Sequence, residues 1–138
     1  MKLATIAVDT SVVVPALIRG HEHHDTARAV MATLPRIPAH VAIESYSVLT
    51  RIPAGYRLSA SDSAALIADI CRDPVLTLPA EAYRQLLTEV SLADITGGAA
   101  YDALIAVTVR YAGATLLTLD RRAEPIYRRI GVEFANPG

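Results

Sequence analysis

Short apolar runs alternate along this chain with longer segments in which apolar residues recur at helical spacing. The first run, 3–8, is apolar on both faces, as expected for a strand buried in a parallel sheet. Similar runs predict further strands at 75–78, 114–119 and 132–134. The helical segments are 11–18, 25–34, 39–52, 60–71, 79–90, 99–111 and 121–129. This alternation predicts one α/β domain over 1–138, with three layers and a mostly parallel central sheet.

Capping residues mark several helix boundaries. Thr10 or Ser11 is expected to cap the first helix, and Gly20 to end it. Pro79 is expected in the first turn of its helix, where the missing amide hydrogen costs little. The single cysteine, Cys71, falls in an apolar helical pattern and is interpreted as a core residue.

Composition and charge narrow the function classes. Of 138 residues, 52% are hydrophobic, yet no apolar stretch approaches the ~20 residues of a membrane span. No signal-peptide pattern is present, so we expect a cytoplasmic protein that does not enter the membrane. With 13 basic and 14 acidic residues, the net charge of −1 argues against tight non-specific binding of nucleic acid. A local phosphate-binding patch of arginines near the end of the chain stays open.

Two predicted strands end in an aspartate, Asp9 and Asp120. Ligands of open α/β sheets bind at the carboxyl ends of the strands. Asp102, in a helical first turn, is expected at the same edge. Glu44 lies in the apolar stripe of its helix, where a carboxylate is costly unless it is paired or bound to a cation. Each acid also has an ordinary explanation, as a helix cap, a dipole partner or the partner of an arginine.

Four acids at one rim favour a metal site, because clustered carboxylates repel one another unless a cation intervenes. Oxygen ligands favour Mg²⁺ or Mn²⁺, and such ions can activate water and neutralise a phosphodiester. Thr10, Ser11 and Thr118 could orient a ligand or bond a phosphate. In contrast, the spacing of His21, His23 and His24 matches no common zinc pattern and indicates a surface turn.

Other folds with acidic pockets fit less well. A receiver domain or a haloacid-dehalogenase-type phosphatase needs a lysine at the site, and the only lysine is Lys2, at the start of the first strand. A dinucleotide-binding fold needs a glycine-rich turn after that strand, and residues 9–12 contain no glycine.

Four stretches, 8–11, 44–51, 97–106 and 116–123, together resemble PIN-domain ribonucleases, and more closely the VapC toxins of VapBC toxin–antitoxin pairs. The resemblance implies an α/β/α PIN fold and an endoribonuclease dependent on Mg²⁺ or Mn²⁺. It also implies a homodimer neutralised by a VapB-type antitoxin whose tail enters the active-site groove. By the same resemblance, the acidic active-site residues of the family correspond to Asp9, Glu44, Asp102 and Asp120. Asp94 falls outside the pattern and is expected on a surface loop.

The resulting hypothesis is metal-assisted hydrolysis of an RNA phosphodiester, with Asp9 as central ligand and Asp102 reinforcing it. Arg51, Arg121 and Arg122 are candidates for contacts to RNA or to the antitoxin. Two alternative hypotheses remain: a PIN fold that binds RNA or protein without cutting it, and a nuclease that cuts DNA. By resemblance, structured transfer or ribosomal RNA is a plausible substrate, recognised by shape or by a narrow groove.

Overall fold

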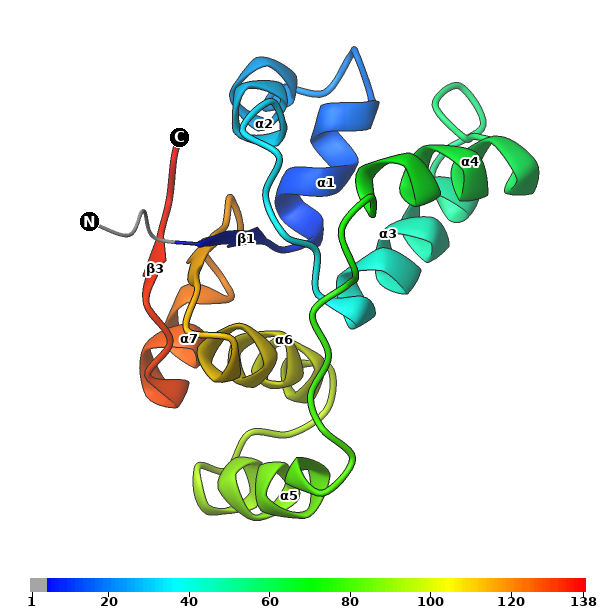
Figure 1. Ribbon diagram of the computed structural model, residues 1–138. Helices are drawn as coiled ribbons and strands as arrows, with labels where there is room; N and C mark the ends of the chain where they lie inside the picture. Colours follow the sequence, from blue (N-terminus) through cyan, green and yellow to red (C-terminus); the bar gives the residue numbers. More distant parts are fainter. Residues whose placement is uncertain (1–4) are drawn as a thin grey trace.

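Three parallel strands form the middle layer of the protein (Figure 1). The computed structural model describes residues 5–138. β1 (Ile6–Val8) pairs with β2 (Thr115–Leu117), and β2 pairs with β3 (Phe134–Ala135). On the other side of β1, single parallel bridges join Ala7 to Arg36 and Pro38 to Leu76. The mostly parallel sheet predicted from the sequence is therefore confirmed.

The strands are shorter than the apolar runs suggested. Residues 3 and 4 of the first predicted strand lie outside the described residues, as does Lys2. The prediction of a strand at 75–78 is wrong, because only Leu76 makes a bridge, with backbone bonds to Ile37 and Ala39. Pro38, its partner, has no amide hydrogen to extend the ladder.

The helices correspond to the predicted segments with shifted ends. They are α1 (Thr10–Leu17), α2 (His24–Met31), α3 (Ala39–Arg51), α4 (Ala60–Ile70), α5 (Ala82–Leu92), α6 (Ala99–Tyr111) and α7 (Glu124–Ile130). Asp9, and not Thr10 or Ser11, caps α1, since its side chain accepts the Ser11 amide. α2 ends before Leu34, whose φ of 56° is left-handed and incompatible with a continuing helix.

Helices cover both faces of the sheet (Figure 1). α1 and α2 pack together on one side, and α6 and α7 on the other. α3 contacts α1 and α6, which brings the start of α3 close to both layers. α4 packs on α3, and α5 packs on α6 at the periphery. The predicted three-layer architecture is confirmed.

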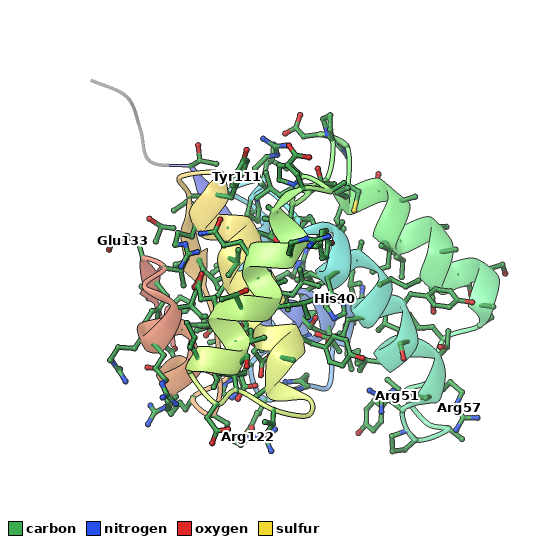
Figure 2. All side chains as sticks on the ribbon, turned by 90° about the horizontal axis from the view of Figure 1, so that it is seen from below. His40, Arg51, Arg57, Tyr111, Arg122 and Glu133 are labelled. Carbon is green, nitrogen blue, oxygen red and sulfur yellow. The ribbon has the colours of Figure 1, made fainter. Side chains whose placement is uncertain are left out.

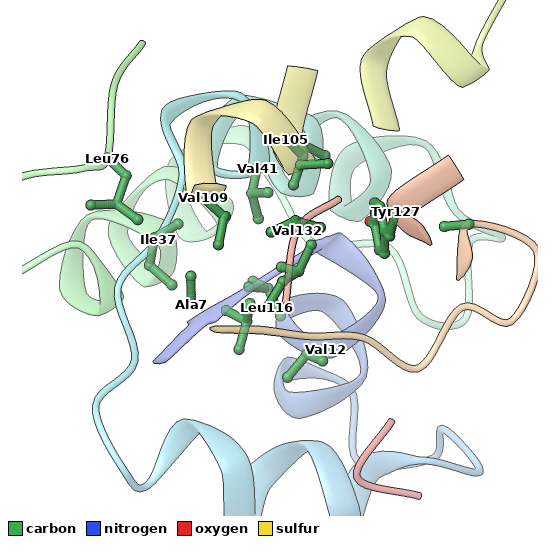
Figure 3. Close-up of a cluster of buried hydrophobic side chains, with 14 of the residues drawn as sticks. Ala7, Val12, Ile37, Val41, Leu76, Ile105, Val109, Leu116, Tyr127 and Val132 are labelled. Carbon is green, nitrogen blue, oxygen red and sulfur yellow. The ribbon is translucent and has the colours of Figure 1, made fainter. Parts of the chain in front are cut away.

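The core lies between the sheet and these helices (Figure 3). Val8, Leu116 and Val41 are fully buried there, and Tyr127 of α7 is the largest of the fully buried side chains. This packing fixes the ends of β1 and β2, where the two strand-end aspartates lie. Cys71 is partly buried against the core, as predicted. Within residues 5–138, no helix has the length and apolar character of a membrane span.

Candidate metal centre and active-site cleft

A cleft of about 470 Å³ opens at the carboxyl ends of β1 and β2. Its walls include Thr10 and Ser11 after β1, Asp120 after β2, Glu44 from α3 and Asp102 from α6. Segments far apart in the sequence therefore meet at the sheet edge where ligands of parallel α/β folds bind.

Asp9 lies at the base of this region and is only 3% exposed. Its Oδ1 accepts the amide of Ser11 at 3.0 Å and also the Ser11 hydroxyl, and its Oδ2 accepts the Tyr127 hydroxyl at 2.7 Å. Burial raises the pKa of Asp9, and the bonds from Ser11, Thr118 and Tyr127 oppose that rise. No ion pair to Asp9 forms within residues 5–138. A carboxylate buried among neutral donors is favourable for a cation.

Ser11 and Thr118 connect the carboxyl ends of β1 and β2. The Ser11 hydroxyl accepts the Leu119 amide at 2.8 Å and lies 3.3 Å from the Thr118 hydroxyl. The Thr118 hydroxyl in turn accepts the Asp120 amide at 3.0 Å. These two predicted supporting hydroxyls thus fix the backbone that carries the acids. Their direct contact with a ligand stays a prediction.

Glu44 is partly buried on the wall formed by α3. Its Oε1 accepts the hydroxyl of Thr10, and its Oε2 lies 3.4 Å from Nε2 of His40. Thr10, the third hydroxyl predicted to support a ligand, therefore orients this carboxylate. The arginine partner that the sequence left open is replaced by a histidine one turn earlier on the same helix.

Asp102 occupies the first turn of α6, as predicted. Burial is the largest cause of the raised pKa of Asp102, and the charges of Asp120, Glu44 and Asp9 add to it, which brings the pKa to about 6. Arg122 opposes the shift weakly. The other three predicted acids therefore all lie close enough to Asp102 to repel its charge.

Asp120 and the candidate arginines differ in position. Asp120 accepts the Arg122 amide at 3.0 Å, and Nε of Arg122 lies 3.7 Å from the same oxygen. The Arg122 side chain is 96% exposed and lines the cleft, while the exposed Arg121 lies beside it. Arg51 stands near Arg57 at the far end of α3, apart from Arg122 (Figure 2). Only Arg122 of the three is brought into the acidic cleft.

Besides His40, sequence reasoning missed three side chains at this site. Tyr127 donates to Asp9 from α7, 118 positions later, and no local pattern distinguishes it from a core tyrosine. His21 and His23, interpreted as a surface turn, line the cleft with ring centroids 5.7 Å apart. The chain connecting α1 to α2 brings them there, which their spacing could not reveal. Asp94 is exposed and absent from the cleft wall, as expected.

The donor set fits a hard divalent cation held in part by water. Within residues 5–138, no three Asp, Glu, His or Cys side chains stand close enough to enclose a metal ion on their own. Mg²⁺ commonly uses one or two carboxylates together with waters and substrate phosphates, so a closed protein cage is not needed. Asp9 and Asp102 have the burial and mutual repulsion suited to that role.

Comparison with known proteins places this geometry in a family. A PIN domain model matches residues 6–129. Ribonuclease VapC40 of Mycobacterium tuberculosis is 44% identical over 128 residues, covering 93% of this chain and 96% of that protein. Ribonuclease VapC27 of the same organism is 40% identical over 128 residues, covering 92% and 93%.

The fold comparison agrees. The crystal structure of M. tuberculosis VapC20, a sarcin-ricin loop cleaving toxin, superposes with a TM-score of 0.69 at 22% identity, covering 88% of this chain and 95% of that one. The α/β/α PIN fold expected from the sequence is confirmed. This chain belongs to the PIN domain family and, within it, to the VapC ribonucleases.

Proposed function

We propose that this protein is an endoribonuclease toxin that hydrolyses RNA phosphodiester bonds with the help of Mg²⁺ or Mn²⁺. The proposal rests on one observation above all: Glu44, Asp102 and Asp120 line a single cleft with Asp9 buried close by, and burial together with the three neighbouring charges raises the pKa of Asp102 to about 6. Its relatives carry the name ribonuclease. We further propose that the protein acts on RNA in the cytoplasm.

When bound, a divalent ion supplies positive charge to the phosphodiester and lowers the pKa of a water molecule. Asp9 and Asp102 would hold it directly, and Glu44 and Asp120 would complete the site through water. The donors to Asp9 from Ser11 and Tyr127 are neutral, so they leave the negative charge of the carboxylate uncompensated.

Contacts around Glu44 and Arg122 orient the other polar groups of the site. The hydroxyl of Thr10 and the ring of His40 fix Glu44 from both sides. Arg122, exposed at the cleft wall, would donate to the RNA backbone near the reacting phosphate. These contacts set the acids in place before substrate arrives.

A VapB-type antitoxin would inhibit the protein, and the active form would be a homodimer. Exposed apolar side chains support protein partners, since Leu87 is 68% and Leu92 is 84% exposed on the peripheral helix α5. Light scattering of the purified chain measures its mass in solution. A monomer at all concentrations would contradict the dimer and leave the nuclease proposal intact.

Cleavage of matched RNA and DNA strands tests the function. We expect RNA cleavage with Mg²⁺ or Mn²⁺, loss of cleavage in EDTA, and recovery on adding the ion back. Asp9→Asn should abolish cleavage without unfolding the protein. Asp94→Asn is the matched control, because Asp94 is exposed, lies away from the cleft, and has a φ of 53° that asparagine tolerates.

Each rival predicts a different outcome of this assay. A binding module would retain RNA without cutting it in any metal. A DNA nuclease would cut the DNA strand and spare the RNA. Cleavage of RNA that persists in EDTA, or in Asp9→Asn, would contradict the proposed metal site.

A further inference from the structure

An aromatic pair lies immediately beside the acidic cleft. The rings of His40 on α3 and Tyr101 on α6 are parallel to within 5°, with centroids 5.1 Å apart. Tyr101 is 55% exposed, whereas His40 is mostly covered, with 22% of its side chain accessible. His40 therefore supports one face of an aromatic ring that remains open to solvent.

Both members of the pair are connected to proposed active-site acids. Tyr101 directly precedes Asp102 in the first turn of α6, and His40 contacts Glu44 one turn along α3. Asp102 and Glu44 line the cleft, while neither aromatic residue does. The exposed ring is thus linked to the cleft wall through His40, which stacks on Tyr101 and contacts Glu44.

Electrostatics alone offers this protein little affinity for RNA. The chain carries a net charge of −1, and three carboxylates line the cleft with Asp9 buried close by. Stacking of a base on an aromatic ring stabilises a complex without a basic surface, and it requires an unpaired base. The exposed ring of Tyr101, which His40 supports on one face, can provide such stacking near the cleft.

We propose that the Tyr101–His40 pair is a stacking platform for an unpaired RNA base adjacent to the scissile phosphate. This inference rests on the proposed function and deepens it, because it defines the substrate as a single-stranded or looped segment. Tyr101 contacts the base and His40 supports Tyr101. Arg122 on the cleft wall holds the neighbouring phosphate.

Tyr111 provides a matched control for Tyr101. It is also a tyrosine of α6, is 64% exposed, and lies at the opposite end of the helix. Figure 2 shows Tyr111 well separated from His40. Replacing either tyrosine by alanine removes the same exposed side chain from the same helix, but only Tyr101 is beside the cleft.

Binding of single-stranded RNA separates these variants. The probe is fluorescein-labelled RNA of random sequence, followed by fluorescence anisotropy in the uncleaving Asp9→Asn background. Tyr101→Ala should weaken binding about 10-fold, whereas Tyr101→Phe, which keeps the ring, and Tyr111→Ala should stay within about 2-fold. With a strand of abasic ribose phosphates, Tyr101→Ala should bind as the parent does.

The possible results distinguish this inference from the function on which it rests. If the wild-type protein cuts no RNA, the proposed function fails. If it cuts RNA but Tyr101→Ala binds the probe as tightly as its parent, the platform alone is overturned. A Tyr101→Ala variant that changes the mass in light scattering, with RNA affinity unchanged, would also overturn it, by assigning the ring to a contact between copies of the chain.

Discussion

Replacing Asp102 by asparagine should stabilise the metal-free protein. The raised pKa of Asp102 means that its charged form is disfavoured in the folded state, by burial first and then by Asp120, Glu44 and Asp9. Its favourable contribution is complete below the unfolded-state pKa near 4 and is lost as the pH rises through about 6. At neutral pH the folded protein therefore carries a cost that asparagine removes.

The size of the Asp102 pKa shift determines how much this charge lowers the free energy of unfolding. A rise from 3.8 to about 6 corresponds to about 3 kcal/mol as an upper bound. Because Asp102 is partly exposed, solvent screening reduces the expected gain to about 1–2 kcal/mol. For a domain of this size the gain amounts to a rise in Tm of about 3–8 °C.

Thermal unfolding followed by circular dichroism in EDTA measures this effect. Asp102→Asn should unfold at higher temperature than wild type near pH 7.5, and the two curves should converge near pH 4. Mg²⁺ should stabilise the wild-type protein more than the variant, because the variant lacks a ligand. If Asp102→Asn were less stable than wild type at neutral pH without metal, the conclusion that the charge of Asp102 is disfavoured in the folded protein would be wrong. Asp94→Asn is the control for the loss of a surface charge.

Three further substitutions test the supports of the site and its surroundings. Tyr127→Phe leaves the buried Asp9 Oδ2 without its donor, so it should cost about 1–3 kcal/mol in denaturant unfolding and raise the Mg²⁺ concentration needed for cleavage. Ser11→Ala should lower stability by a similar amount and reduce the rate of cleavage, because the hydroxyl contacts both Asp9 and the backbone after β2. Arg110→Ala breaks a partly exposed pair with Glu89 at 2.9 Å, so it should cost about 1 kcal/mol and leave cleavage unchanged.

The positions of the acids could be predicted because local pattern and sheet geometry both fix them. Asp9 and Asp120 follow apolar strands, and parallel strands bring their carboxyl ends to one edge. Glu44 was conspicuous because a carboxylate within an apolar stripe needs a partner, and the structure supplies Thr10 and His40. These inferences depend on periodicity and chain direction, which the sequence contains.

Contacts between distant side chains could not be predicted in the same way. Tyr127 reaches Asp9 through the packing of α7, and an apolar pattern does not say which hydroxyl meets which carboxylate. His21 and His23 reach the cleft through the path of a connecting segment, not through any motif. Strand ends were overestimated for a related reason, since an apolar run such as 75–78 can be buried without pairing along its length.

RNA cleavage by the purified chain as a function of divalent metal tests the central claim most directly. The account predicts cleavage of a single-stranded RNA that rises with added Mg²⁺ or Mn²⁺ in wild type and in Asp94→Asn, and that is absent in Asp9→Asn at every metal concentration. Equal cleavage by Asp9→Asn and wild type would contradict it.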